Sequence, residues 1–438
     1  MTARTSSLYA AYVVFLLFLA NVANYGQRMI VSILLPSIQA DMTLTDAQMG
    51  VMMGGGFAIF FALTGVPLAR FADRNGRARW LSVAILFWST ATGLFGLTRS
   101  FAQMLAARIA LGLGESVCVP TSHSLLADYV SPENRPFVFG LHSTGAVLGA
   151  TLALILGGYL EVRVGWRDAM VYFAVSGLAL AALMLLTLRE PRREALAKTD
   201  PKSVPLGEVV RYLVSLRSYV LVVVAVCFGM LVEFGLNQWL PSYYVRHFSL
   251  SVSEVGFRYG LTVALGGIPG SVLGGLIAND LARRDIRWLV WFPAGMYMIA
   301  LPVGLSMLLA HSAALALALN GAYAFAIFTT NGALWAACFV HVPAVMRATT
   351  SAPTLLIAGV TGLAMGPALV GGISGLLSAQ GGGRALQSSL VFVELLAVGV
   401  IVPLLLAAPY LRREHEVRQR GESIARAPSL AQPLKEGL

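Results

Sequence analysis

The strongest constraint on this chain is a series of long apolar stretches, about a dozen along its 438 residues. A helix needs roughly 20 apolar residues to cross a lipid bilayer, and the stretches are of that order. Hydrophobic residues make up 57% of the chain, charged residues make up 12%, and the mean hydropathy is +0.74. These values lie well outside the range of an ordinary soluble domain. The sequence therefore predicts an all-α polytopic membrane protein with twelve transmembrane helices.

The basic residues follow the loops between these stretches. If the N-terminus is cytoplasmic, the basic residues left for the outer loops are only Arg99, Arg163, Arg167, Arg246 and Arg384. This asymmetry is the positive-inside rule, and it puts both termini in the cytoplasm. The net charge of +10 therefore reflects topology and does not indicate nucleic-acid binding. Arginine and alanine are abundant and lysine is scarce, which is typical of a bacterial genome of high GC content, so we expect a bacterial inner (plasma) membrane protein.

The longest polar interruption within the chain runs from Arg189 to Arg217 and separates six spans from six. Transporters are often built from such repeated halves, with the substrate site between them near the bilayer midplane. We predict two pseudo-symmetric six-helix bundles, residues 1–189 and 218–410, joined by a cytoplasmic linker, residues 190–217. A cytoplasmic disordered tail, residues 411–438, is expected to follow the second bundle.

Ionisable residues at membrane depth are costly and usually face a cavity or a partner. Arg28 lies late in the first span, and Arg108 and Glu115 lie in the fourth. A spacing of seven residues is close to two helical turns, so Arg108 and Glu115 share one face, roughly 10 Å apart along the axis. Guanidinium groups match carboxylates and phosphates. We predict that Arg28 and Arg108, with Tyr25 beside them, bind an anionic substrate.

Glu115 is the carboxylate expected to exchange a proton, because burial and a nearby arginine act on its ionisation in opposite senses. The alternative is an internal ion pair or hydrogen-bond network that only holds the first and fourth helices together. Gly112 and Gly114 are interpreted as packing notches that let helices approach closely.

Two further acids and one aromatic group are weaker candidates. Glu233 in the seventh span and Glu394 in the twelfth are each interpreted either as titrating groups or as hydrogen-bond partners of a neighbouring helix. We keep Glu233 as a second proton-coupling candidate. Trp239, Tyr243 and Tyr244 lie near the outer end of the seventh span, where interfacial anchoring is expected.

The segment from Pro67 to Arg79 carries five charges between two nearly uncharged spans. It resembles the loop between the second and third helices of the major facilitator superfamily, whose pattern is Gly-x-Leu-Ala-Asp-Arg-x-Gly-Arg-Arg. The resemblance implies a loop that tethers neighbouring helices and helps gate transport, with Asp73, Arg74, Gly76 and Arg77 as the gating residues. A degenerate echo follows the eighth span, where Asn279 stands at the position of Asp73.

Beyond this loop, the chain resembles the spinster-like branch of the superfamily and, less closely, the organic anion and cation symporter branch. The segments that carry the resemblance are residues 24–28, 35–39, 108–115, 239–242, 274–287, 346–349 and 362–367. Both branches commonly have aspartate-arginine in the first span, where this chain has Gln27 and Arg28. The resemblance therefore implies either that coupling rests on Glu115 alone or that the protein is an exchanger or a facilitator.

These observations favour a secondary active transporter that moves a small organic anion by alternating access and is coupled to protons. The first alternative is a spinster-type exporter of lysophospholipid-like or other amphipathic compounds. A membrane sensor without transport is the alternative from another class. No enzyme motif, nucleotide-binding loop, metal-spaced His/Cys cluster or cofactor site is apparent, so we expect neither an enzyme nor a bound metal or cofactor.

Overall fold

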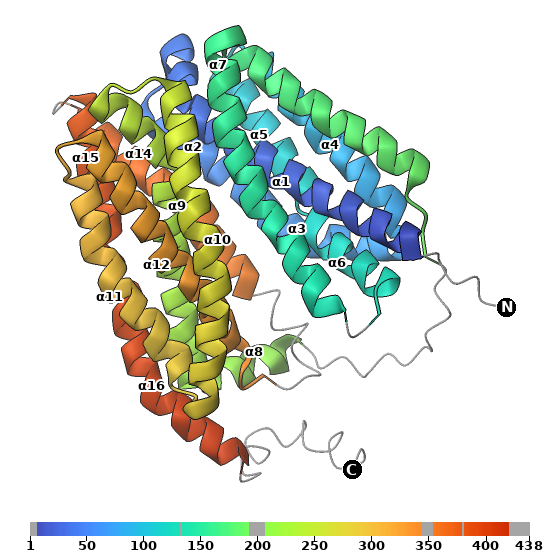
Figure 1. The fold of residues 1–438 in the computed structure, drawn as a ribbon, viewed down its shortest axis with the longest axis vertical. Coiled ribbons are helices and arrows are strands. Elements are labelled where there is room, and N and C mark those ends of the chain that lie inside the picture. Colours follow the sequence, from blue (N-terminus) through green and yellow to red (C-terminus); the bar gives the residue numbers. More distant parts are fainter. Residues whose placement is uncertain (1–6, 132–133, 192–205, 343–353, 379–380, 420–438) are drawn as a thin grey trace.

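The chain folds into long helices that run back and forth between the two ends of the molecule (Figure 1). The computed structural model describes residues 7–131, 134–191, 206–342, 354–378 and 381–419, and no strand occurs in these ranges. Ten helices within them are long and apolar enough to cross a membrane. One of these, α7 (Arg135–Thr187), contains two rods, because Gly165 breaks it with a φ of 82° and a ψ of 165°. When the two rods of α7 are counted separately and the 20-residue α4 (Arg77–Gly96) is added to the ten, the total is the twelve spans that the sequence predicts.

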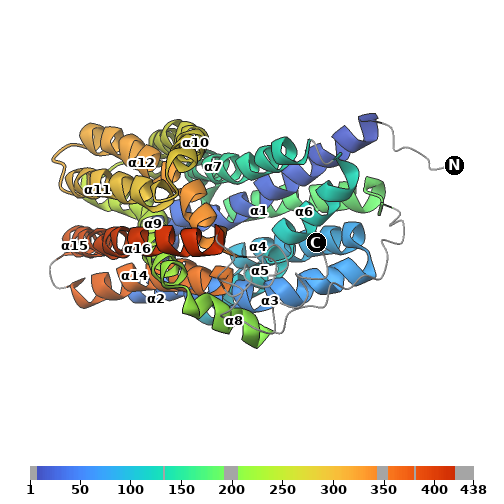
Figure 2. The same ribbon diagram turned by 90° about the horizontal axis from the view of Figure 1, so that it is seen from below.

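The twelve spans form two bundles that lie side by side (Figures 1 and 2). Besides α4 and α7, the first bundle contains α1 (Ser7–Met42), α2 (Asp46–Met53), α3 (Gly55–Asn75), α5 (Phe101–Glu115) and α6 (Cys118–Tyr129). The second contains α9 (Arg217–Phe248), α10 (Val252–Arg284), α11 (Trp288–Leu308), α12 (Ala313–Phe339), the π-helical η1 (Val360–Met365), α14 (Gly366–Leu376), α15 (Gly382–Leu395) and α16 (Val398–Gln419). A short helix, α8 (Leu206–Ser215), precedes the second bundle.

The two ends of the molecule differ. At the end that we call proximal, α1 begins, α16 ends and α8 lies nearby (Figure 1). At the opposite, distal end, α1 turns into α2, and α9 turns into α10. The bundles make close backbone contact at the distal end: a Cβ on Gly256 of α10 would lie 2.3 Å from the carbonyl oxygen of Leu154 in α7. Glycine is required there because the two helices approach within backbone distance.

Several spans are interrupted, which the sequence did not predict. The second span breaks between α2 and α3, and the fourth between α5 and α6. The helix α16 continues to Gln419, nine residues beyond the predicted end of the second bundle, so residues 411–419 are helical and not disordered. Residues 420–438 and half of the predicted linker, residues 192–205, lie outside the described ranges.

The aromatic residues near the distal end of α9 correct another expectation. Trp239, Tyr243 and Tyr244 are fully buried instead of lying at a membrane interface. Their polar atoms donate to backbone carbonyls of neighbouring helices, as Trp239 does to Pro367 (3.0 Å) and Tyr243 to Leu308 (2.7 Å). An aromatic side chain whose N–H or O–H finds a buried partner serves equally well in a core.

Candidate functional site

The candidate site lies at the break in the fourth span. Arg108 and Glu115 both lie on α5 and are both buried, and α5 ends at Glu115. The glycines before this break are packing notches, as predicted: a Cβ on Gly112 would lie 2.4 Å from the carbonyl oxygen of Phe57, and one on Gly114 would lie 2.8 Å from Cβ of Trp88. The close fit seats the end of α5 against α3 and α4 and directs Glu115 toward α1.

Glu115 pairs with Arg28 of α1. Arg28 Nε and Nη2 both lie 2.9 Å from Glu115 Oε2, and the two side chains are almost completely buried. Arg28 also donates to Asn24 Oδ1 (3.1 Å), one helical turn earlier on α1. The pair therefore joins the first and fourth spans, in agreement with the alternative of an internal ion pair that holds these two helices together. The second carboxylate oxygen, Oε1, has no hydrogen-bond partner among the described residues.

Aromatic rings surround the guanidinium of Arg28. Its Cζ atom lies 4.7 Å from the ring centroid of Tyr25, 4.9 Å from that of Phe57 and 5.0 Å from that of Phe61. A cation over an aromatic face is stabilised by the ring quadrupole, more so when both are removed from water. Tyr25, predicted to contact substrate, thus contacts Arg28 directly.

Arg108 is the buried cation with the fewest partners at this site. Its side chain is 1% exposed, yet Nε and Nη1 have no hydrogen-bond partner in the described part of the chain. Nη2 makes only a long contact of 3.5 Å with the carbonyl oxygen of Met53, and the ring of Phe57 lies 5.4 Å from Cζ. Removing an ion from water costs several kcal/mol unless a partner compensates. The described partners compensate this cost only in part.

The charges of the site do not balance. With Arg28, Arg108 and Glu115 ionised, the cluster carries one net positive charge inside the membrane. Guanidinium donors offer a planar fork that fits carboxylate or phosphate oxygens, and Arg108 keeps two such donors without a protein acceptor. The arrangement can accept an anion at Arg108, beside the Arg28–Glu115 ion pair.

Gln27 faces away from this cluster. Its amide nitrogen donates to Ser89 Oγ (3.2 Å) and to the carbonyl oxygen of Phe173 (2.9 Å), and its amide oxygen accepts from Thr92 (3.0 Å). These partners lie on α4 and α7. The residue that replaces the acid of the resembled branches is therefore part of the packing between spans of the first bundle.

The two candidate acids of the second bundle make no hydrogen bond with Glu115 among the described residues. Glu394 is buried and accepts a hydrogen bond of 2.8 Å from Tyr323 of α12, in agreement with the hydrogen-bonding alternative. Glu233 is half-buried in α9 and lies within electrostatic reach of Tyr297 and Tyr323. A role for Glu233 in proton coupling stays a prediction.

The charged loop joins helices within the first bundle. Gly76 connects α3 to α4 with a φ of +99°, a conformation that favours glycine. Arg77 is 1% exposed and donates to Glu190 Oε1 (2.9 Å) and to Ser124 Oγ (2.9 Å), and it also pairs with Asp128. Asp73 accepts from Ser124 (3.2 Å), whereas Arg74 is exposed. The tethering expected of this loop is thus present, and its role in gating stays a prediction.

Sequence reasoning did not identify Asn24, Phe57 and Phe61 as parts of the site. Asn24 stands four residues before Arg28, so helical spacing alone was a usable signal for it. The two phenylalanines lie in an apolar stretch with no distinguishing pattern. Only the fit of α3 against α1 and α5 brings them to the arginines.

A family model for the major facilitator superfamily matches residues 17–361 of this sequence. The chain belongs to the major facilitator superfamily. The resemblance, the fold and the prediction that the chain is not an enzyme are thereby confirmed. The protein is an integral membrane protein, since its relatives and its apolar helices are those of a membrane transporter fold.

Several members of the superfamily resemble this one along most of its length. An efflux pump of the superfamily from Mycolicibacterium smegmatis is 30% identical, with 90% of this chain and 92% of that protein covered. The hexuronate transporter of Bacillus subtilis is 28% identical, with 90% and 95% covered. Among solved structures, a bacterial homologue of the human lysosomal transporter Spinster is 25% identical and superposes with a TM-score of 0.85, with 94% and 99% covered. That homologue was solved in an inward-facing, unoccupied conformation.

Proposed function

We propose that this protein is a secondary active transporter that moves a small organic anion by alternating access and is coupled to protons. The observation that carries the proposal is Arg108, a buried guanidinium with two donors that no described protein group accepts from. The hexuronate transporter of Bacillus subtilis supports the same substrate class, because its substrate is a sugar acid.

In this proposal the substrate carboxylate binds Arg108 and then competes with Glu115 for Arg28. Glu115 takes up a proton when it loses Arg28, since a buried carboxylate without its partner is costly in the charged form. Tyr25 forms part of the wall beside Arg28. Substrate and proton are thereby coupled through a single exchange of partners.

The moving bodies are residues 1–189 and 218–410, which rock about the substrate site. We place both termini in the cytoplasm of a bacterial cell, so that the proximal end faces inward in the inner membrane. The distal end, where the bundles touch, is then closed toward the outside. The inward-facing conformation of the Spinster homologue, with which this chain superposes closely, supports that orientation.

A thermal-shift titration with D-glucuronate tests the anion site. We expect the anion to stabilise the purified wild-type protein and Arg108→Ala to weaken its binding at least about tenfold, as for the loss of hydrogen bonds to a charged group. The matched control is Arg258→Ala, because Arg258 is exposed and its ion-pair partner in the described part of the chain is Glu254 on the same helix. Equal stabilisation of wild type and Arg108→Ala would contradict the assignment.

The alternative is an exporter of lysophospholipid-like or other amphipathic compounds. The efflux pump and the Spinster homologue among the relatives favour it, as do the aromatic rings of Phe57 and Phe61 beside the arginines. Stabilisation by lysophospholipid and by no small organic anion would support this alternative. Neither the relatives nor the site adds support to a sensor without transport.

A further inference from the structure

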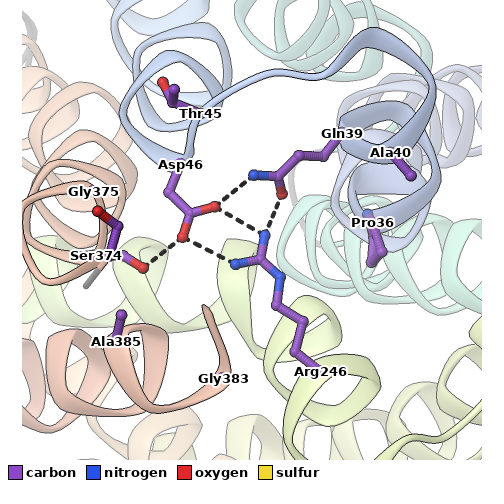
Figure 3. A pocket seen from close by; sticks show the side chains of 11 residues that line it. Pro36, Gln39, Ala40, Thr45, Asp46, Arg246, Ser374, Gly375, Gly383 and Ala385 are labelled. Carbon is purple, nitrogen blue, oxygen red and sulfur yellow. Dashed lines mark hydrogen bonds and ion pairs between the residues drawn. The ribbon is translucent and has the colours of Figure 1, made fainter. Parts of the chain in front are cut away.

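A cavity of about 630 Å³ opens at the distal end, between the two bundles. Pro36, Gln39 and Asp46 of the first bundle line it, together with Arg246, Ser374 and Gly383 of the second. Figure 3 shows four of these side chains converging from separate helices of both bundles on one point in this cavity. Arg246 is one of the few basic residues that the positive-inside rule leaves at this end.

The point of convergence is an ion pair between the bundles. Arg246 Nη1 lies 2.9 Å from Asp46 Oδ2, and Nη2 lies 3.0 Å from Oδ1, so the guanidinium and the carboxylate meet as two forks (Figure 3). Their side chains are 18% and 10% exposed. A bidentate pair of this kind is geometrically specific, and partial burial protects it from screening by salt.

Two further side chains complete the network. Gln39 at the end of α1 donates to Asp46 Oδ1 (2.7 Å) and accepts from Arg246, and Ser374 of α14 donates to Asp46 Oδ2. Both oxygens of Asp46 and both terminal nitrogens of Arg246 are therefore engaged. Because these charges neutralise each other, the cavity offers no free charge to a substrate.

The backbone beside the ion pair is equally close. Asp46 is the first residue of α2, and a Cβ on Gly371 of α14 would lie 2.3 Å from the carbonyl oxygen of Asp46 and 2.9 Å from Cα of Gly50. Arg246 lies on α9 and Gly371 on α14, both in the second bundle, so separation of α2 from these two helices would break the ion pair and this contact together. The ion pair is thus one of the contacts that must break when the bundles separate at the distal end.

We propose that Asp46, Arg246, Gln39 and Ser374 form a distal latch, which holds the distal end closed and must open once in each transport cycle. The inference rests on the proposed alternating access. The latch adds to that mechanism a pair of residues that sets the balance between the two end states, at a distance from the substrate site.

The experiment measures the distal gap directly and requires no substrate. Spin labels are placed at Arg99→Cys, in the turn after α4, and at His311→Cys, in the turn after α11, with the three native cysteines replaced by alanine. Both positions are exposed and lie at the distal end of different bundles. Double electron–electron resonance then reports the fraction of protein in which the distal end is open.

Asp46→Asn is expected to raise the open fraction about tenfold. Loss of this partly buried ion pair should cost more than loss of an exposed pair and less than loss of a fully buried one. The matched control is Asp41→Asn, because Asp41 pairs with Arg167 at 2.9 Å at the same end but within the first bundle. The charge-reversed variant Asp46→Arg/Arg246→Asp should return toward the wild-type distribution.

An Asp46→Asn distribution that matches wild type or Asp41→Asn would overturn the latch. So would a charge-reversed variant that stays as open as Asp46→Asn. Because the readout is a distance, a protein that transports no organic anion but opens in Asp46→Asn would contradict the proposed substrate and leave the latch supported.

Discussion

At the scale of single residues, the site depends on which partner each charge takes. The sequence indicated that Arg28, Arg108 and Glu115 belong together, because charges at membrane depth are few. It did not predict that Glu115 pairs with Arg28, or that two donor nitrogens of Arg108 have no acceptor among the described residues. Helical spacing groups residues along one helix, whereas the choice of partner depends on how α1 and α5 meet. For the same reason, the sequence did not indicate that Asp46 and Arg246, which are 200 residues apart, form an ion pair.

Glu115→Gln tests the proton-coupling role. Glutamine keeps a hydrogen-bond acceptor for Arg28 but cannot exchange a proton with the site. We expect uptake driven by a pH gradient to be lost, while exchange of substrate for substrate in the absence of a gradient persists. Uptake assays in proteoliposomes measure both. If Glu115→Gln keeps its response to the gradient and Glu233→Gln loses it, the proton site lies in the second bundle.

Arg77→Ala tests the structural role of the charged loop, and Arg74→Ala, at an exposed position in the same loop, is the comparison. Removal of Arg77 leaves Glu190 and Asp128 without their buried cation, so we expect a loss of about 2 kcal/mol of stability, as for hydrogen bonds to charged groups. Arg74→Ala, at an exposed position, should change stability by less than about 0.5 kcal/mol. Thermal unfolding in detergent compares the two variants. Equal unfolding temperatures would show that Arg77 does not tie the helices together.

At the scale of elements, the sequence predicted the number of spans well and their interruptions poorly. Each apolar stretch long enough to cross a bilayer forms a helical span, because length and hydropathy are local properties of the sequence. The breaks at Gly54 and after Glu115 depend on what each helix meets in the bundle, and many glycines in these spans lie in unbroken helix. The spacing of residues along the sequence could not show where a span would be interrupted.

The crossing of α7 and α10 provides a test at this scale. In Gly256→Ala the new methyl group would lie 2.3 Å from the carbonyl oxygen of Leu154, so the helices must part. We expect the distal label pair Arg99→Cys and His311→Cys to report a longer mean distance. Gly275→Ala on the same helix is the control, because nothing lies within 4 Å of its added Cβ. A Gly256→Ala distance equal to that of the control would mean that this crossing does not hold the distal end closed.

At the scale of the whole molecule, two bundles touch at the distal end, and the first bundle contains the buried charges of Arg28, Arg108 and Glu115. The proposed anion site and the proposed distal latch use different charges: Arg108 has two donor nitrogens without an acceptor among the described residues, whereas Arg246 has its terminal nitrogens engaged by Asp46 and Gln39. This division lets substrate binding and distal opening be perturbed separately. The halves were predictable from the polar interruption between them, but the closed distal end was not, because both end states of a transporter share one sequence.

The most direct test of the anion-transport account is uptake of radiolabelled D-glucuronate into proteoliposomes under an imposed pH gradient. The account predicts uptake by the wild-type protein and by Arg258→Ala, together with loss of uptake in Arg108→Ala. Wild-type protein that moves no sugar acid or other small organic anion, or Arg108→Ala that moves it as fast as wild type, would contradict the account.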